Sequence, residues 1–178
     1  PSRGLGDVYK RQEIVVKNYG TIALELDADV APITVENFAN LVNEGFYNGL
    51  TFHRIISGFM IQGGGYTKDF KEKHCDSIKG EFKSNGVNNE LKHTEGVLSM
   101  ARTMIKDSAS SQFFIMHKAA PHLDGSYAAF GKIIEGMDIV NKIAETDTDY
   151  SDRPLDEQKM KKVTVDTMGT EYPEPEKA

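Results

Sequence analysis

Residues 51–64, TFHRIISGFMIQGG, place one arginine, Arg54, in an otherwise apolar run that also carries Gln62. A later run, SQFFIM, supplies Gln112 and Phe114. Arginine stays charged in proteins and presents several N–H donors in a rigid, planar fork. Together these residues supply a charged hydrogen-bond donor, two amide groups and an aromatic ring, with no nucleophile or metal ligand among them.

Periodicity alone leaves two interpretations of these residues open. In one, Arg54 is a surface side chain whose stem lies on apolar neighbours, and those neighbours are ordinary core. The neighbours concerned are Phe59, Met60, Phe114 and Leu123. In the other interpretation, all of them face one site. Alternation along a strand puts Arg54 and His53 on opposite faces, so only one of these two would face such a site.

Other kinds of chemistry find little support in the sequence. The glycines at 63–65 lack the spacing of a phosphate-binding loop, and we interpret them as a turn. DTDYSD starts like a calcium-binding loop, but Asp152 stands where glycine is needed and Gln158 where a bidentate glutamate is needed. The five histidines show no metal-binding spacing, and Ser111 has no triad pattern around it. We therefore expect neither a cofactor nor a metal site.

The composition is that of an ordinary folded protein. The chain has 178 residues, of which 39% are hydrophobic and 27% charged, and this length favours one domain. The net charge of −6 argues against binding to nucleic acid, for which a basic surface is typical. No apolar run approaches the roughly 20 residues that span a bilayer, so we expect no membrane partner. The single cysteine, Cys75, cannot form an internal disulfide, which fits a reducing compartment.

The first residues differ in character from the rest of the chain. SRGLGDVYKRQ, at 2–12, has no hydrophobic period and resembles the translation of an adapter oligonucleotide used in DNA library preparation. We therefore treat 1–12 as an artefact, expect the native sequence to differ before Glu13, and assign the folded domain to 13–169. The tail at 170–178 is expected to be flexible.

Between the two ends, short runs of β-branched and apolar residues alternate with turn signals. We predict strands over 14–16, 21–27, 96–101, 111–116, 128–134 and 161–168, two strands within 50–64, and helices over 32–44 and 137–145. The stretch 65–95 is read as a surface excursion with at most a short strand near 78–82. Because the helices do not alternate regularly with the strands, seven or eight strands favour a mainly β fold, a closed antiparallel barrel with helices at its ends.

Four blocks of the sequence resemble the signature segments of the cyclophilin-type peptidyl-prolyl cis–trans isomerases: FHRIISGFMIQGG, LSMA, SQFFI and LDGSYAAFGKIIEGMDIV. The resemblance runs from about Ile14 to Gly169, with the blocks in the family's order. It implies an eight-stranded antiparallel barrel capped by two helices, with a substrate groove on the outside of the barrel. The activity it implies is rotation about X–Pro peptide bonds in polypeptides, which assists protein folding.

The resemblance also implies a role for each candidate residue. Arg54 matches the family's catalytic arginine, and Gln62 matches the glutamine that positions it. The pocket for the proline ring would be formed by Phe59, which we group with the catalytic residues, and by Met60, Phe114 and Leu123. The remaining substrate-binding residues are Gln112, Ala101 and Arg102, which hold the flanking peptide, and His122 and Tyr127.

The chain departs from the best-known eukaryotic members at several positions. It has His122 where they have tryptophan, Tyr127 where they have histidine, and Arg102 where they have asparagine. A charged segment, KDFKEKHCD, replaces a glycine-rich loop. These differences resemble the family's bacterial branch. Losing the indole N–H and its apolar area implies weak cyclosporin binding with isomerase activity retained, and Arg102 and the charged segment are expected to alter the preference for residues flanking proline.

Two classes of function follow. The first is a single-domain isomerase that acts on proline-containing segments of unfolded or folding proteins. The alternative is a non-catalytic proline-peptide-binding or chaperone module that keeps the groove without turnover. Arg54 and Gln62 together favour the enzyme, because a pure binder would not need that pair. We expect a cytoplasmic monomer, with export left open because 1–12 stands in place of the native start.

Overall fold

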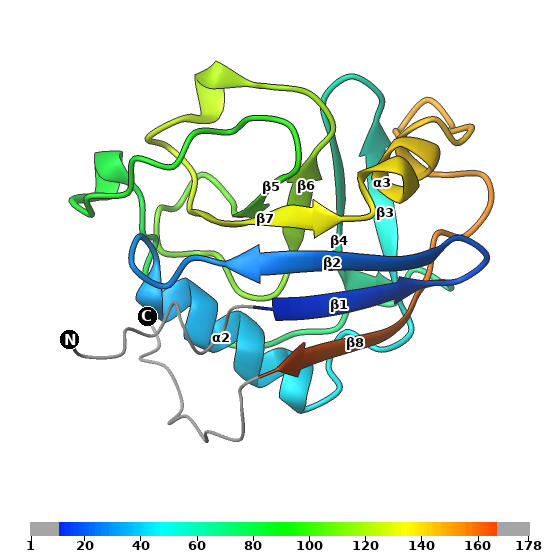
Figure 1. Cartoon of the computed structure of the whole chain (residues 1–178), viewed down its shortest axis with the longest axis horizontal. Coiled ribbons are helices and arrows are strands. Elements are labelled where there is room, and N and C mark those ends of the chain that lie inside the picture. The colour runs from blue at the N-terminus through cyan, green and yellow to red at the C-terminus, as the bar shows by residue number, and fades with distance from the viewer. Residues whose placement is uncertain (1–10, 167–178) are drawn as a thin grey trace.

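The computed structural model of the protein describes residues 11–166 (Figure 1). Within that range, eight strands and two α-helices follow one another along the chain. In order they are β1 (Arg11–Val16), β2 (Gly20–Leu26), α2 (Pro32–Asn43), β3 (Leu50–Ile56), β4 (Met60–Thr67), β5 (Val97–Met100), β6 (Phe113–Met116), β7 (Ala129–Glu135), α3 (Met137–Ala144) and β8 (Met160–Asp166). Two short 3-10 helices, η1 (Lys83–Asn85) and η2 (Pro121–Leu123), lie in the connections.

The strands form one antiparallel sheet in the order β3-β4-β6-β5-β7-β2-β1-β8. The first and last strands of this order meet, because the Phe52 N–H donates to the Gln158 carbonyl at 2.8 Å and Thr51 pairs with Lys159 in a single bridge. The sheet therefore curls into a nearly closed barrel, which leaves no long exposed edge. The predicted fold class, an eight-stranded antiparallel barrel capped by two helices, is confirmed.

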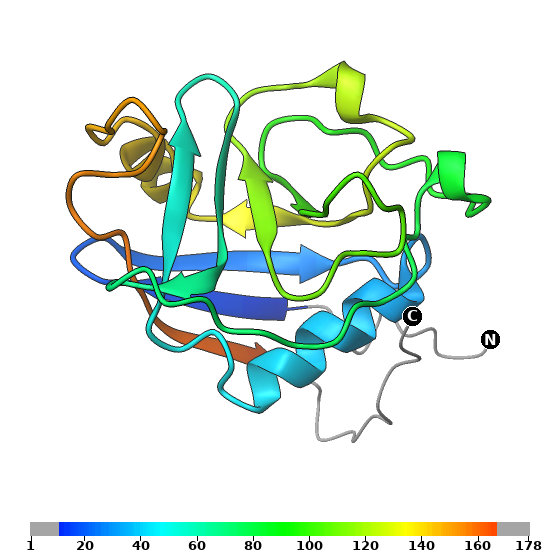
Figure 2. The ribbon, with the colours of Figure 1, turned by 180° about the vertical axis from the view of Figure 1, so that it is seen from behind.

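The two helices lie at opposite ends of the barrel (Figures 1 and 2). Helix α2 begins with Pro32, whose fixed φ suits a first turn. The chain leaves α2 through Gly45 with a left-handed φ of +72°, as the sequence indicated. The buried face of α2 packs into the barrel, where the ring centroids of Phe38 and Phe113 lie 5.3 Å apart. Since the interior is filled with side chains, a binding site has to be sought on the outside.

The glycines at 63–65 are not the turn that the sequence suggested, because they continue strand β4. A Cβ on Gly63 would lie 2.6 Å from the Thr51 carbonyl oxygen, and a Cβ on Gly65 would overlap the Gln112 side chain. At Gly63 and Gly65 glycine is therefore required by the close approach of neighbouring groups rather than by chain reversal, and at Gly64 a left-handed φ of +90° also requires it.

Most element bounds lie within a few residues of the prediction. Strand β1, however, begins at Arg11, so two residues of the segment set aside at 1–12 pair with β2 and β8. Ile78 forms an isolated bridge with Ala109 and no strand over 78–82. The predicted tail at 170–178 lies outside the described residues. No helix in the described part of the chain is long and apolar enough to cross a membrane.

Candidate active site on the outer face of the barrel

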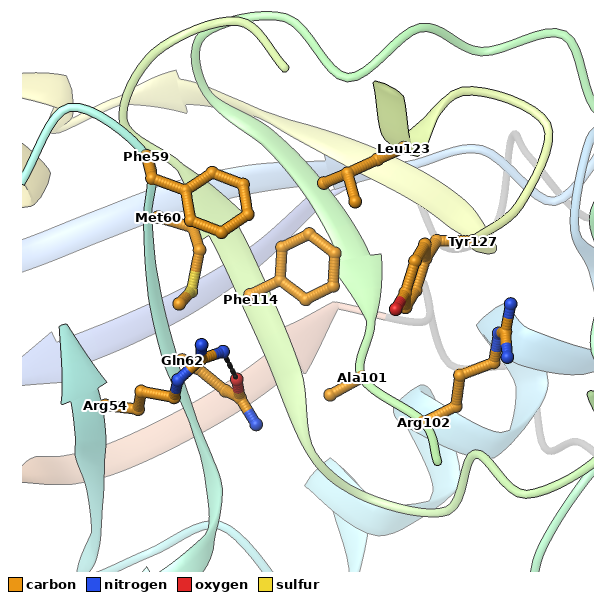
Figure 3. Close-up of a pocket in the computed structure, with 9 residues that line it drawn as sticks. All are labelled: Arg54, Phe59, Met60, Gln62, Ala101, Arg102, Phe114, Leu123 and Tyr127. Atoms are coloured by element: carbon orange, nitrogen blue, oxygen red, sulfur yellow. Dashed lines mark hydrogen bonds between the residues drawn. The ribbon is translucent and has the colours of Figure 1, made fainter. Parts of the chain in front are cut away.

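A cavity of about 200 Å³ opens on the outside of the barrel (Figure 3). Its lining residues come from segments that are far apart in sequence: Arg54, Phe59, Met60, Gln62, Ala101, Arg102, Phe114, Leu123 and Tyr127. All 9 are residues predicted for the site. The other two predicted residues lie beside it, since Gln112 bonds to Gln62 and the exposed His122 ring lies 5.8 Å from the Phe59 ring. We call this cavity the outer pocket.

Arg54 is held at the outer pocket by neutral partners. It lies opposite Gln62 in the β3–β4 ladder, and its Nη1 donates to Gln62 Oε1 at 3.3 Å. Gln62 Nε2 donates in turn to Gln112 Oε1 at 3.0 Å. The guanidinium is exposed and forms no salt bridge within residues 11–166. Most of its N–H donors therefore stay available to a ligand.

The strand that carries Arg54 is irregular at the preceding residue. The register between β3 and β4 shifts between Phe52 and Arg54, which leaves His53 in a β-bulge. Bulges occur next to active sites, where they change the direction of a side chain. Arg54 lines the outer pocket and His53 does not, as alternation along the strand predicted.

The apolar part of the outer pocket rests on a hydrophobic cluster that is separate from the barrel interior. The buried members of this cluster are Met60, Val97, Phe114, Met116, Ala120, Leu123 and Ala129. Figure 3 shows Phe59 and Tyr127 on either side of the Phe114 ring. The backbone N–H of His117 donates to the Phe59 carbonyl at 2.9 Å, which fixes Phe59 at the end of β6. The hollow between these rings is suited to a small apolar ring.

Arg102 holds one wall of the outer pocket in place. Its guanidinium lies between two rings, with its carbon 4.7 Å from the centre of Phe82 and 4.6 Å from the centre of Tyr127. Its Nε and Nη2 donate to the Ser126 carbonyl at 3.2 and 2.6 Å, and Nη1 donates to the Thr103 carbonyl at 2.9 Å. Because these donors are engaged, Arg102 acts on the pocket through its planar faces, by supporting Tyr127.

A buried polar chain behind Phe114 was missed by the sequence analysis. His93 Nδ1 lies 3.0 Å from Asp124 Oδ1, and His93 Nε2 lies 2.8 Å from Ser99 Oγ. Since a carboxylate only accepts, Nδ1 carries a proton and donates to Asp124. This is the order of groups in a nucleophilic triad, but Ser99 is 0% exposed and cannot meet a substrate. The His93 ring stacks on Phe114, with centroids 6.1 Å apart, and supports the pocket floor.

Burial and hydrogen bonding set the charge states in this chain. Burial lowers the pKa of His93, although Asp124 opposes the effect, so the imidazole is neutral near pH 7. Burial alone would raise the pKa of Asp124, but hydrogen bonds from the His93 backbone and ring hold it below its usual value. The pair therefore consists of a neutral imidazole and a carboxylate, and with the proton on Nδ1 the Ser99 hydroxyl donates to Nε2.

The outer pocket combines one available guanidinium with an apolar floor. Serine, cysteine and lysine are absent from its lining. No three histidine, cysteine, aspartate or glutamate side chains among residues 11–166 gather as a metal site would require. The arrangement can hold an apolar ring and donate hydrogen bonds to polar atoms beside that ring.

Comparison with known proteins gives consistent matches. A family model described as cyclophilin type peptidyl-prolyl cis-trans isomerase/CLD matches residues 12–165. The chain is 44% identical over 142 residues to peptidyl-prolyl cis-trans isomerase A of Dickeya dadantii, covering 76% of this chain and 72% of that protein. It is 41% identical over 161 residues to peptidyl-prolyl cis-trans isomerase B of Escherichia coli, covering 83% and 95%.

Among solved structures, a similar one is a cyclophilin type peptidyl-prolyl cis-trans isomerase of Cryptosporidium parvum, crystallised in the presence of the dipeptide Ala-Pro. It has a TM-score of 0.75 and 32% sequence identity, and the alignment covers 87% of this chain and 98% of that one. The family match at 12–165 includes every residue of the outer pocket.

Proposed function

The chain belongs to the cyclophilin-type peptidyl-prolyl cis–trans isomerase family, and from this premise we propose that it rotates X–Pro peptide bonds with Arg54 as its catalytic residue. The relatives named above are themselves called peptidyl-prolyl cis–trans isomerases. The neighbour crystallised with Ala-Pro supports a proline-containing peptide as the ligand of the outer pocket. The proposed substrates are X–Pro segments of unfolded or folding polypeptides.

The chemistry of this reaction asks for hydrogen-bond donors rather than for a nucleophile. An X–Pro amide rotates slowly because resonance gives its C–N bond partial double-bond character, with a barrier of about 18–20 kcal/mol. Halfway through the rotation the conjugation is lost, and the proline nitrogen becomes a pyramidal hydrogen-bond acceptor. A donor fixed next to that nitrogen binds the twisted state more strongly than either planar state, which lowers the barrier. Turnover near 10³ s⁻¹ requires a reduction of roughly 7 kcal/mol.

Each part of the outer pocket has a place in this mechanism. Phe59, Met60, Phe114 and Leu123 would hold the proline ring while the preceding carbonyl turns. Arg54 would donate to the proline nitrogen, and Gln62 would orient the guanidinium. Gln112, with the backbone at Ala101 and Arg102, would hold the flanking peptide, and Tyr127 and His122 would border the ring.

The observation that carries the proposal is the state of the Arg54 guanidinium. It is exposed at an apolar pocket, its direction is fixed by a neutral amide at 3.3 Å, and no carboxylate in residues 11–166 pairs with it. A guanidinium in a salt bridge would be a poor donor to a substrate, since the ion pair would have to break first. The geometry therefore favours an active enzyme over a binding module.

The test is the variant Arg54→Ala, assayed by NMR exchange on an Ala-Pro peptide and by a refolding reaction that is limited by proline isomerisation. We expect kcat/KM to fall by about 10²- to 10³-fold, as when a fixed transition-state donor is removed. The Kd for the peptide should change little, because the apolar pocket is intact. Lys132→Ala, which removes an exposed cation on β7 away from the outer pocket, is the matched control.

The alternative, a non-catalytic proline-peptide-binding or chaperone module, makes the opposite prediction. In that case the wild-type chain and Arg54→Ala would bind the peptide equally and would both leave the exchange rate at its uncatalysed value. Equal acceleration of refolding by the two chains would also rule out Arg54 as the catalytic residue.

We further predict weak inhibition by cyclosporin with activity retained. His122 lies at the rim beside Phe59, where the drug would meet an imidazole in place of a larger indole. Titration of isomerase activity with cyclosporin measures the effect, and His122→Trp is expected to strengthen inhibition. Tight nanomolar inhibition of the wild-type chain would contradict the prediction.

We also propose that the protein is a cytoplasmic monomer of the family's bacterial branch, with 13–169 as its native domain. The substitutions at Arg102, His122 and Tyr127 support the branch. The single cysteine supports a reducing compartment. Size-exclusion chromatography with light scattering tests the oligomeric state.

A further inference from the structure

A second cavity, of about 290 Å³, lies at the seam where the barrel closes. It is formed between β3 and the loop that precedes β8, and Figures 1 and 2 show this loop beside β3. Among its lining residues are His53, Lys68, Phe70, Arg153, Leu155 and Gln158. Its lining shares no residue with the outer pocket. We call it the seam cavity.

One wall of the seam cavity is a stack of aromatic rings that ends in a cation. The His53 and Tyr66 ring centroids are 4.6 Å apart, and Tyr66 stacks on Phe70 at 5.1 Å. The Arg153 guanidinium lies over the Phe70 ring, 3.5 Å from its centre. Phe70 has a left-handed φ of +62°, which is unfavourable for a bulky residue and is held by its surroundings. The stack therefore fixes the position of the guanidinium.

Two cations at the seam cavity have no ion-pair partner. Neither Lys68 nor Arg153 is in a salt bridge in the described part of the chain, and the guanidinium makes no hydrogen bond there. Of the two acidic residues in the lining, Asp149 accepts backbone N–H groups of its own loop at 2.8 and 3.1 Å. Glu157 pairs with Lys17 at 3.1 Å. Backbone N–H groups do not neutralise a carboxylate, and Glu157 also interacts electrostatically with Lys68. Counting Lys17, three cations therefore face two carboxylates at the seam cavity, and one positive charge is left to attract an anion.

The lining also contains polar atoms without partners and an apolar rim. Gln158 is 3% exposed, and its Oε1 has no hydrogen-bond partner; the same is true of the shielded Nδ1 of His53. Buried polar atoms of this kind are rare in native proteins, and a bound water or ion is one explanation for them. At the rim, Leu155 is 66% exposed and Phe70 38% exposed. Exposed apolar side chains next to unpaired charge are typical of binding sites for peptides.

From these features we propose that the seam cavity is a second peptide-binding site, separate from the outer pocket. Its ligand is a segment of a partner protein in which a carboxylate side chain stands next to a large apolar residue. The carboxylate binds to Arg153 and Lys68. The apolar side chain packs on Leu155 and on the exposed edge of the Phe70 ring, whose two faces are covered by Tyr66 and Arg153. The site does not require proline, because it has no part in the rotation of the X–Pro bond.

The probe is a proline-free peptide, acetyl-Ala-Leu-Glu-Phe-Ala-amide, compared with the same peptide carrying glutamine in place of glutamate. Backbone NMR shifts of the full chain are followed during titration. We expect the glutamate peptide to shift the signals of His53, Phe70 and Leu155, and not those of Phe114 and Leu123. Arg153→Gln should weaken this binding about tenfold, the effect of losing a charge-assisted hydrogen bond. Lys132→Gln makes the same change of charge away from the seam cavity and should leave the Kd unchanged.

Three results would overturn the proposal: equal binding of the two peptides, equal Kd for the wild-type chain and Arg153→Gln, or shifts confined to the outer pocket. Free 3-phenylpropionate provides a further arm. If it binds as tightly as the peptide and shifts the same signals, the ligand is a small carboxylate and not a peptide. Arg54→Ala separates this proposal from the proposed catalysis, because it should lower kcat/KM for isomerisation by about 10²- to 10³-fold and leave binding at the seam cavity intact.

Discussion

At the scale of single residues, the partner of Arg54 matters as much as Arg54 itself. Gln62 and Gln112 form a chain of neutral amides at 3.3 and 3.0 Å that fixes the guanidinium without neutralising it. A carboxylate at the same place would hold the guanidinium more tightly, but it would compete with the substrate for the same donors. An amide partner is therefore the choice that keeps the donor both directed and available.

We predict that Gln62→Glu lowers activity, although the new side chain has nearly the same shape as the wild-type one. The new carboxylate should pair with Arg54, and we expect kcat/KM to fall by about tenfold, a barrier increase of about 1.4 kcal/mol. Gln62→Ala removes the positioning contact without adding a competitor, and it should cause a smaller loss. Measuring kcat/KM against peptide for both variants gives the comparison. An alanine variant less active than the glutamate variant would show that orientation, not competition, is the stronger effect.

At the scale of elements, the site depends on strands and loops that meet from distant parts of the chain. β3 and β4 carry Arg54 and Gln62, β6 carries Phe114, and the loop after η2 carries Tyr127. Arg102, at the end of β5, holds this loop through the Ser126 carbonyl and through its stack on Tyr127. Arg102 thus joins the connection between β5 and β6 to the connection between η2 and β7.

Strand β1 contains a local conflict that leads to a stability prediction. Gln12 is 0% exposed, and neither its Oε1 nor its Nε2 has a hydrogen-bond partner. Burying an amide without partners destabilises a protein by about 1–3 kcal/mol. Gln12→Leu, which is apolar and of similar length, should therefore raise the free energy of unfolding by about that amount. Urea denaturation measures the change, with Lys132→Leu at an exposed position of β7 as the control. No gain for Gln12→Leu would show that water or a shift of the chain satisfies the amide.

At the scale of the whole molecule, the sequence predicted the barrel, both helices and the residues of the outer pocket because these rest on local patterns and on motif blocks. The sequence did not reveal the contacts that form only when distant segments pack together. His93 meets Ser99 and Asp124, which lie 6 and 31 positions away, only after β5 and the η2 loop have packed together. The glycines at 63–65 were misread because close strand approach and chain reversal both require glycine, and the sequence does not distinguish them.

The closure of the barrel also makes the stability of the whole fold sensitive to pH. His53 lies under the seam, where burial, and secondly the charge of Arg54, lowers its pKa from the ordinary value of 6.5 to about 4. The unfolded chain takes up a proton on this imidazole near pH 6.5, whereas the folded chain does so only near pH 4. The contribution of neutral His53 to the free energy of unfolding is therefore complete above about pH 6.5, and it is lost progressively as the pH falls toward 4.

We accordingly predict that acidification from pH 7 to pH 4 lowers the free energy of unfolding, with His53 contributing at most about 3 kcal/mol. Urea denaturation at a series of pH values measures the loss. The variant His53→Gln cannot take up this proton, so its loss over the same range should be smaller by the contribution of His53. His74→Gln, which removes a side chain that is 78% exposed, is the matched control. If His53→Gln and the wild-type chain lose the same stability between pH 7 and pH 4, the imidazole at the seam does not control the acid sensitivity of the barrel.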